Sequence, residues 1–450
     1  MQGQRVKHVL VGVGTVLALA CTQPPNTPDA GSNNGVDAGA STPDAGANTS
    51  DAGVDAGTNG QCLGATAMQS AVAGPGVGPA RAAVEAVLAD VPVAGAVVGL
   101  AVGSRVAWLE GFGLARPQDG TAATPDTPFA IASVTKTLVA VVIMQLVEEG
   151  RLQLDVGVGQ QAPALAGVVN PAFPGVAITP RMLLTHTSSL FDEPFTFDET
   201  YSSSGDATLS MRDFVLGYFD PQSPYWGTAD MWWPNTPGTF SCYSNMGVGV
   251  LGVLAQEISG QSLETLMQQR IFAPLGMTRT SFFIRSYCDP ALLAQGVAWN
   301  GTSFVPDNLG QGPQPEGHPE LASGMLRTTA YDLLRFAMAM GNGGVLDGAR
   351  ILSDATVAQL FMRQLSGMEA TCGDGRADPA QQAVLWFHFP DPQGNDWVGH
   401  YGGMNGVAAA MWLLAGDNVR YVVIVNQADI GAVGRIEVAM LENLAGILQQ

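Results

Sequence analysis

Positive charge is scarce in this chain, and lysine is the scarcest part of it. The 450 residues include 19 basic and 39 acidic side chains, which gives a formal net charge of −20. All but two of the basic residues are arginine, and the two lysines are Lys7 and Lys136. This balance argues against binding of nucleic acid and against electrostatic attachment to anionic lipid.

Several catalytic patterns are also missing from the chain. It has no His-x-His or His-Glu-x-x-His pattern, so we expect neither a catalytic zinc nor any other metal or cofactor. It has no Gly-x-Ser-x-Gly elbow either, which argues against an α/β-hydrolase.

The first 62 residues have the composition of targeting and linker segments. Arg5 and Lys7 precede an apolar run over residues 9–20 that is too short to span a bilayer, which predicts a signal peptide over residues 1–20. Ala18-Leu19-Ala20-Cys21 resembles a bacterial lipobox and predicts lipidation of Cys21. We therefore expect a protein anchored by lipid in the bacterial cell envelope, with outer-membrane sorting indicated by Thr22. Ordinary cleavage, with a secreted or periplasmic product, is the alternative.

Residues 21–62 repeat Asp-Ala-Gly at irregular spacing and contain no aromatic or basic residue. Such a segment cannot bury enough apolar surface to fold, so we interpret it as a disordered tether. Apart from Cys21, the chain has four cysteines, an even number that allows two disulfides in an exported protein and leaves three pairings open. These are Cys62, Cys242, Cys288 and Cys372.

Residues 63–450 form the predicted catalytic domain. Alternating apolar patterns predict strands over residues 94–103, 105–113, 383–389, 406–414 and 419–426, and helical patterns predict a first helix over 78–91 and a last one over 430–448. The middle of the chain is rich in loops and helices. We therefore expect an α/β lobe from about residues 78–132 and 322–450, an all-α lobe from about 133–321, and an active site between them.

Ser133 and Lys136 stand three residues apart at the start of a helix that is apolar on nearly all sides. Side chains at this spacing share a helix face. A serine hydroxyl needs a base to become a nucleophile, and a buried lysine, unlike arginine, can lose its proton and serve as that base. The Ser-x-x-Lys pattern with its single lysine thus predicts nucleophilic catalysis.

The motifs around this pair resemble the serine β-lactamase and penicillin-binding protein family. Ser133-Val134-Thr135-Lys136 is similar to its nucleophile motif, Tyr243-Ser244-Asn245 to its second motif, and His400-Tyr401-Gly402 to its third. The chain looks most similar to the group of class C β-lactamases, D-alanyl-D-alanine carboxypeptidases and family VIII esterases. The resemblance covers about residues 78–448 and implies an α/β fold with an antiparallel sheet flanked by helices.

The resemblance also implies the site residues. Ser133 would be the acylated nucleophile, Lys136 its base, and Tyr243 the group that passes the proton to the leaving group. The residues expected to bind substrate are Asn245, His400, Gly402 and Gly403, and the N–H groups of Ser133 and Gly403 would form the oxyanion hole. His186, in the similar Leu-Leu-Thr-His-Thr-Ser segment, is interpreted as structural.

Three departures from the family pattern affect the function that we predict. His400 replaces the usual lysine, Tyr401 a small hydroxyl residue, and Ser189 a common glycine. We predict an esterase or a D-amino-acid peptidase or amidase, acting on small esters, amides or peptidoglycan-type peptides. A β-lactamase, or an envelope binding protein with little turnover, is the alternative. Aromatic residues between 225 and 233 either line the acyl pocket or pack within their own loop.

Overall fold

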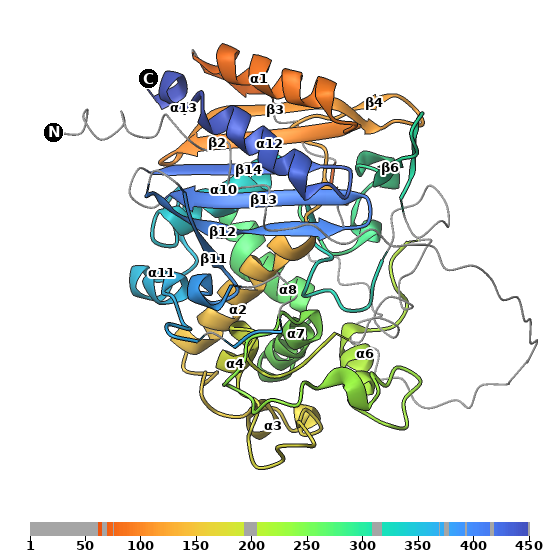
Figure 1. Ribbon diagram of the computed structural model, residues 1–450, viewed down its shortest axis with the longest axis vertical. Coiled ribbons are helices and arrows are strands. Elements are labelled where there is room, and N and C mark those ends of the chain that lie inside the picture. The colour runs from red at the N-terminus through yellow and green to blue at the C-terminus, as the bar shows by residue number, and fades with distance from the viewer. Residues whose placement is uncertain are drawn as a thin grey trace, which may run out of the picture.

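Figure 1 shows the computed structural model of the chain. It describes residues 62–64, 70–74, 76–192, 205–307, 317–368, 370–372, 378–391, 394–414 and 418–448. The predicted signal peptide, Cys21 and nearly all of the predicted tether lie outside these residues. Of the helices in the described part, none is both long and apolar enough to cross a membrane.

A single antiparallel sheet joins the two ends of the described chain. Its main path runs in the order β1-β3-β2-β14-β13-β12-β11. The N-terminal strands β2 (Gly95–Val102) and β3 (Arg105–Arg116) form the predicted hairpin, and β14 (Val419–Val425) pairs with β2 along its whole length. The other main strands are β1 (Val72–Ala73), β11 (Phe387–Pro390), β12 (Asp396–Met404) and β13 (Val407–Leu414).

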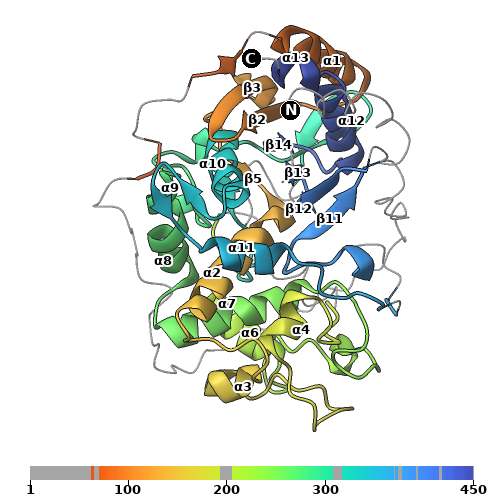
Figure 2. The ribbon, with the colours of Figure 1, turned by 90° about the vertical axis from the view of Figure 1, so that its left-hand side faces the viewer.

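Helices cover both faces of this sheet. Because side chains alternate along a strand, Tyr421 and Val423 of β14 face one layer while Val422 and Ile424 face the other. The first layer is made of α1 (Val77–Asp90), α12 (Ile430–Leu441) and α13 (Leu444–Leu448). The opposite face is covered by α10 (Ala330–Gly341), and Figure 2 shows the sheet between α10 and α12.

The helical part of the molecule lies below the sheet in Figure 1. Its centre is α2 (Thr135–Glu148), in which every residue from Thr135 to Leu146 is buried, as the all-round apolar pattern predicts. Packed against it are α7 (Asn245–Ser259), α8 (Leu263–Met267) and α11 (Asp354–Phe361), and α4 (Pro180–Leu184) and α6 (Met211–Tyr218) pack in turn against α7. The fold class is thus the one expected from the sequence, whereas the exact lobe boundaries stay a prediction.

Three elements differ from the sequence-based expectation. The strand expected over residues 383–389 exists only as β11, because Leu385 adopts a left-handed backbone conformation (φ 52°) that extended strands do not allow. The last helix is split in two between Leu441 and Leu444. Ser133 does not lie in α2 but in a short 3₁₀ turn, Ala132–Val134, directly before it.

The four cysteines form two disulfides, Cys62–Cys288 and Cys242–Cys372. The first connects the start of the described chain to the loop after the short 3₁₀ turn Ile284–Ser286. The second joins the residue before Tyr243 to a segment 130 positions later in the chain.

Candidate active site

The backbone before Ser133 is shaped to expose this one side chain. The short strand β5 (Phe129–Ala130) pairs with β8 (Arg327–Thr328), and the chain then turns through Ala132, whose φ of 44° is rare for a residue with a side chain. Ser133 follows and is partly exposed, whereas its neighbours Ala132 and Val134 are buried. Backbone strain of this kind costs about 1–3 kcal/mol and is concentrated at functional sites.

Lys136 lies in the first turn of α2 and is fully buried. Its Nζ donates to Ser133 Oγ at 3.0 Å, to Asn245 Oδ1 at 2.7 Å and to the Ser323 carbonyl at 2.6 Å. Three acceptors match the three N–H bonds of an ammonium group. Loss of one proton would leave a neutral amine with its lone pair available to the Ser133 hydroxyl.

Tyr243 and Asn245 come from the N-terminal end of α7. Ser244 caps this helix, since its Oγ accepts the Gly247 N–H at 3.0 Å. The cap places Tyr243 just before the helix and Asn245 at its first residue. The Lys136 Nζ lies 4.9 Å from the centroid of the Tyr243 ring, so nucleophile, lysine, tyrosine and asparagine form one group.

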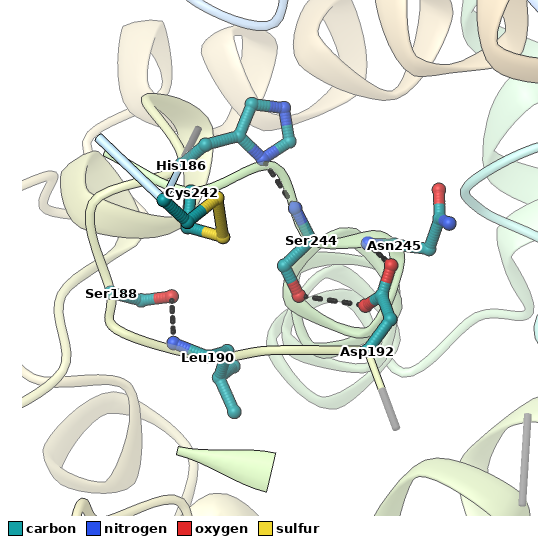
Figure 3. The surroundings of a disulfide bond; sticks show 8 residues. His186, Ser188, Leu190, Asp192, Cys242, Ser244 and Asn245 are labelled. Carbon is teal, nitrogen blue, oxygen red and sulfur yellow. Dashed lines mark hydrogen bonds between the residues drawn. A yellow bond between two sulfur atoms is a disulfide. The ribbon is translucent and has the colours of Figure 1, made fainter. Parts of the chain in front are cut away.

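Asp192 holds the N-terminal end of α7 in place, as Figure 3 shows. Its Oδ2 accepts the Asn245 N–H at 2.8 Å, and its Oδ1 accepts the Ser244 hydroxyl at 3.0 Å and the Met246 N–H at 2.9 Å. A carboxylate here satisfies helix N–H groups that have no partner within the helix and also complements the helix dipole. Sequence reasoning missed Asp192, whose only signal is its place shortly after the Leu-Leu-Thr-His-Thr-Ser segment (Leu183–Ser188).

His186 fixes the same segment from the other side. Its carbonyl accepts the Cys242 N–H at 2.8 Å, and its Nδ1 accepts the Ser244 N–H at 3.2 Å. The imidazole lies against the Tyr243 ring, with 4.4 Å between the ring centroids. Burial, with smaller contributions from Lys136 and His400, holds the pKa of His186 well below its usual range, so the ring is neutral and carries its proton on Nε2. These contacts agree with the structural role expected for His186.

Strand β12 brings His400, Gly402 and Gly403 to the nucleophile. Strand β11 pairs only with residues 396–399 of β12, so from His400 onward this edge of β12 is free to pack against the Ala132–Val134 turn. A Cβ on Gly402 would lie 2.2 Å from the Ile131 carbonyl oxygen and 3.1 Å from the Ser133 nitrogen. Glycine therefore allows the close approach that brings this strand next to the Ser133 N–H, where the oxyanion hole is expected.

His400 is buried and electrically neutral. Burial and the nearby charge of Lys136 lower its pKa to about 3. Its Nδ1 hydrogen-bonds the Tyr401 carbonyl and therefore carries the proton, which leaves Nε2 as an acceptor with no hydrogen-bond partner among the described residues. The ring lies 6.3 Å from that of Tyr243. Lys136 is the only lysine in the described residues. Because His400 is neutral, Lys136 provides the positive charge of this group.

The other two departures from the family pattern have local explanations. Tyr401 points to the opposite face of the sheet, where its hydroxyl donates to Glu437 Oε2 at 2.9 Å, so it takes no part in this group of residues. Ser189 has the left-handed conformation (φ 62°) that favours glycine, and its Oγ accepts a hydrogen bond from Asn170 Nδ2 at 2.9 Å.

The aromatic residues of the 225–233 segment pack against aromatic rings of neighbouring segments. The backbone N–H of Trp233 donates to the Ser189 carbonyl at 2.8 Å, and the centroid of the Trp233 ring lies 5.4 Å from that of Phe191 and 5.6 Å from that of Phe240. This cluster adjoins Asp192, while its role as an acyl pocket stays a prediction. Among the described residues, no group of three or more His, Cys, Asp or Glu side chains could hold a metal ion.

All seven predicted catalytic and substrate-binding residues thus meet at one place, whereas Cys21 lies outside the described residues. A family model described as Beta-lactamase matches residues 80–441 of the chain. Penicillin-binding protein 4 of Amycolatopsis lactamdurans is 29% identical over 310 residues, which cover 67% of this chain and 72% of that protein. The chain spans 51–58% of the length of several other curated relatives.

Solved structures share the same fold. A penicillin-binding protein homologue from Pyrococcus abyssi superimposes with a TM-score of 0.65 at 22% identity, over 83% of this chain and 78% of that one. A D-amino acid amidase from Ochrobactrum anthropi gives a TM-score of 0.63 at 19% identity, over 82% and 99% of the two chains. The match of the family model over most of the chain shows that this protein belongs to the beta-lactamase family, a family of serine hydrolases.

Proposed function

We propose that the protein hydrolyses its substrate through an acyl-enzyme on Ser133. Lys136 accepts the hydroxyl proton, and Oγ forms a bond to the carbonyl carbon of the substrate. When the bond to the leaving group breaks, Tyr243 donates a proton to it and regains one from Lys136. Water then attacks the ester carbon and gives a proton to Tyr243, which passes its own proton to Lys136. Lys136 returns that proton to Ser133 Oγ as the ester bond breaks. The observation that carries this proposal is the 3.0 Å hydrogen bond between Lys136 Nζ and Ser133 Oγ beside the Tyr243 ring.

Two features support stabilisation of the charge that develops during this reaction. The Ser133 N–H lies at a helix start, and strand β12 approaches it at Gly402, so Gly403 is close enough to provide the second donor. Each oxyanion-hole donor is worth about 3 kcal/mol of transition-state stabilisation.

The charge of the site favours substrates without a carboxylate on the leaving group. Many substrates of penicillin-binding proteins carry such a carboxylate, for which a second cation would be needed. His400 is neutral at every ordinary pH, because burial lowers its pKa to about 3. We therefore propose esters and amides, including D-amino-acid amides, ahead of β-lactams and peptides with a free terminal carboxylate.

Covalent labelling tests the acyl-enzyme. Intact-protein mass spectrometry after treatment with a fluorophosphonate should show one adduct, located at Ser133 by peptide mapping and absent from Ser133→Ala. A wild-type protein that gains no adduct would support the binding-protein alternative and refute the enzyme.

Substrates that differ only in charge test the substrate class. D-Alanyl-D-alaninamide should be hydrolysed faster than D-alanyl-D-alanine, which has the same acyl group and a charged leaving group. p-Nitrophenyl butyrate reports ester hydrolysis, and nitrocefin reports β-lactam hydrolysis. Faster turnover of the charged dipeptide or of nitrocefin would contradict the proposed class.

We also propose that the protein is exported and anchored to the cell envelope through lipid on Cys21. The signal and lipobox-like sequences support this proposal, as do two disulfides, which form in oxidising compartments. Mature protein from cells should carry the mass of a lipid on Cys21 and partition with membranes. Recovery of unmodified mature protein from the periplasm or medium would favour the secreted alternative.

A further inference from the structure

A second ionisable group lies behind Lys136 and has no part in the acylation scheme. Glu320 is fully buried. Its carboxyl accepts the Ser323 N–H, at 3.0 Å for Oε1 and 3.2 Å for Oε2, and also accepts the Ser323 hydroxyl. The carbonyl of the same Ser323 accepts the Lys136 Nζ at 2.6 Å. One residue therefore links a buried carboxyl to the lysine beside the nucleophile.

The surroundings of Glu320 leave it little freedom to move. Gly249 of α7 is so close that a Cβ there would lie 2.9 Å from Glu320 Cγ and 3.1 Å from a methyl of Val215 on α6. The Glu320 N–H donates to His318 Nδ1 at 2.9 Å. A carboxyl clamped in this way can hold Ser323, and with it the carbonyl that contacts Lys136, in one position.

The Glu320 carboxyl changes between its neutral and charged forms near neutral pH. Burial raises the pKa of Glu320 to about 7, while the Ser323 hydrogen bonds and the positive charge of Lys136 act in the opposite direction. Asp192, from the segment that follows α4, raises it further. Within the described residues, the charged and titratable groups that act on or contact Glu320 are Lys136 on α2, Asp192, and His318 on its own segment, while α7 approaches it at Gly249.

We infer that Glu320 is a positioning residue for acylation: it fixes the Ser323 carbonyl against Lys136 and stabilises the ammonium that forms when Lys136 takes the Ser133 proton. The inference rests on the proposed acyl-enzyme. A nearby carboxylate favours the charged form of a lysine. Without it, Lys136 loses its proton at lower pH, and the neutral base is available over a wider pH range.

The pH dependence of labelling by a fluorophosphonate measures this effect. In that reaction Oγ bonds to phosphorus, fluoride leaves, and the hydroxyl proton passes to Lys136. Measured from about pH 5 to pH 9, the wild-type rate should rise with pH, because only the neutral amine of Lys136 can accept the Ser133 proton. Glu320→Gln keeps an acceptor for Ser323 but removes the charge, and it should move this rise to lower pH by about one unit.

Ser323→Ala provides a second variant that keeps both the carboxyl and the carbonyl. It removes one hydrogen bond that favours the charged carboxylate, so its rise should shift in the same direction by a smaller amount. Glu264→Gln is the matched control. Glu264 is also a buried glutamate that accepts a serine hydroxyl (Ser281, 2.7 Å) and a backbone N–H (Phe282, 3.1 Å), but its charged neighbours are Arg285 and Asp206.

Wild-type pH dependence in both Glu320→Gln and Ser323→Ala would overturn the inference, as would an equal shift in Glu264→Gln. If Glu320→Gln does not fold, as judged by its circular dichroism, Ser323→Ala decides alone. A wild-type protein that gains no label at any pH would instead refute the proposed acyl-enzyme, so the two failures are distinguishable.

Discussion

Lys136 must both give up and regain a proton, and its surroundings show why arginine cannot replace it. The ammonium fits between three acceptors in a fully buried site. A guanidinium is larger, and it stays protonated at any pH at which proteins fold.

Lys136→Arg should therefore abolish acylation although it keeps the positive charge. Loss of a positioned general base costs about 100- to 10,000-fold in rate. The rate of labelling by a fluorophosphonate measures the loss, and an unchanged thermal unfolding midpoint would show that the fold is intact. Near-normal labelling of a folded Lys136→Arg would refute the role assigned to this lysine.

His400 is the residue that we expect to set the preference for uncharged leaving groups. His400→Lys should raise hydrolysis of D-alanyl-D-alanine relative to D-alanyl-D-alaninamide by about tenfold, which corresponds to one new charge-assisted contact of about 1.4 kcal/mol. The ratio of kcat/KM for the two substrates is the measurement, and His388→Lys on the neighbouring strand is the control. A ratio unchanged from that of the wild type would show that substrate charge is read elsewhere.

The sequence reveals the site residues that belong to motifs but not those that act through contacts made by the fold. Ser133, Lys136, Tyr243 and the β12 residues belong to short motifs whose chemistry depends on residue type and spacing. Asp192 and Glu320 act through hydrogen bonds to groups that the fold brings near, such as the Asn245 N–H and Ser323. An isolated acidic residue has no pattern of its own, so only the three-dimensional structure could identify these two.

Local structure was predictable where a pattern extends over a whole element. The hairpin of β2 and β3 and the buried α2 follow from long apolar patterns and a Gly-Ser turn. The first half of the strand expected over residues 383–389 was not, because its apolar residues include a turn at Leu385 that only the backbone conformation reveals. Residues 383–386 are buried, so they are apolar in sequence whether they form a turn or a strand.

The segment that carries Tyr243 is held from both sides. Ser241 exchanges backbone hydrogen bonds of 3.0 and 3.1 Å with Ala370 and Cys372, and the Cys242–Cys372 disulfide fixes the same contact covalently. On the other side His186 holds Cys242 and Ser244. A tyrosine that transfers a proton must keep its position to within a fraction of an ångström, so loosening this segment should slow catalysis.

Cys372→Ser should therefore lower kcat by about tenfold with a smaller change in KM, because proton transfer needs the orientation of Tyr243 more than binding does. Cys288→Ser removes the other disulfide, which does not join the segment that carries Tyr243, and should leave kcat close to that of the wild type. Steady-state kinetics of p-nitrophenyl butyrate hydrolysis compare the two. An equal fall in both variants would indicate a general loss of stability rather than a local effect.

The whole molecule brings together three distant parts of the sequence at this site. Pairing of β14 with β2 joins the C-terminal strands to the N-terminal hairpin, and the helices between them carry Lys136 and Asn245 to the same edge. The sheet therefore determines where β12 meets the Ser133 turn. The face of the sheet away from the site also contains a buried acid, Glu437 on α12.

Glu437 makes the stability of the whole fold depend on pH. Burial raises its pKa to about 8, although the Tyr401 hydroxyl acts in the opposite direction. An unfolded glutamate titrates near pH 4.3, or about four units lower, so between these values the folded protein binds the extra proton and its stability falls as pH rises. The neutral histidines His186 and His400 have the opposite effect, but only below about pH 6.5, where the unfolded chain protonates them. The other buried acids with raised pKa values titrate near pH 6 to 7: Glu264, Glu320 and Asp332.

The range above neutrality therefore isolates Glu437. From about pH 7 to pH 8.5 the free energy of unfolding should fall by about 1 kcal/mol, most of it from this one carboxyl. Glu437→Gln keeps an acceptor for Tyr401 but cannot ionise, so its stability should be nearly constant over the same range. Urea unfolding followed by tryptophan fluorescence measures both proteins, with Glu264→Gln as a variant that should keep the wild-type slope. A Glu437→Gln protein that loses stability as steeply as the wild type would show that this carboxyl is already ionised in the folded state.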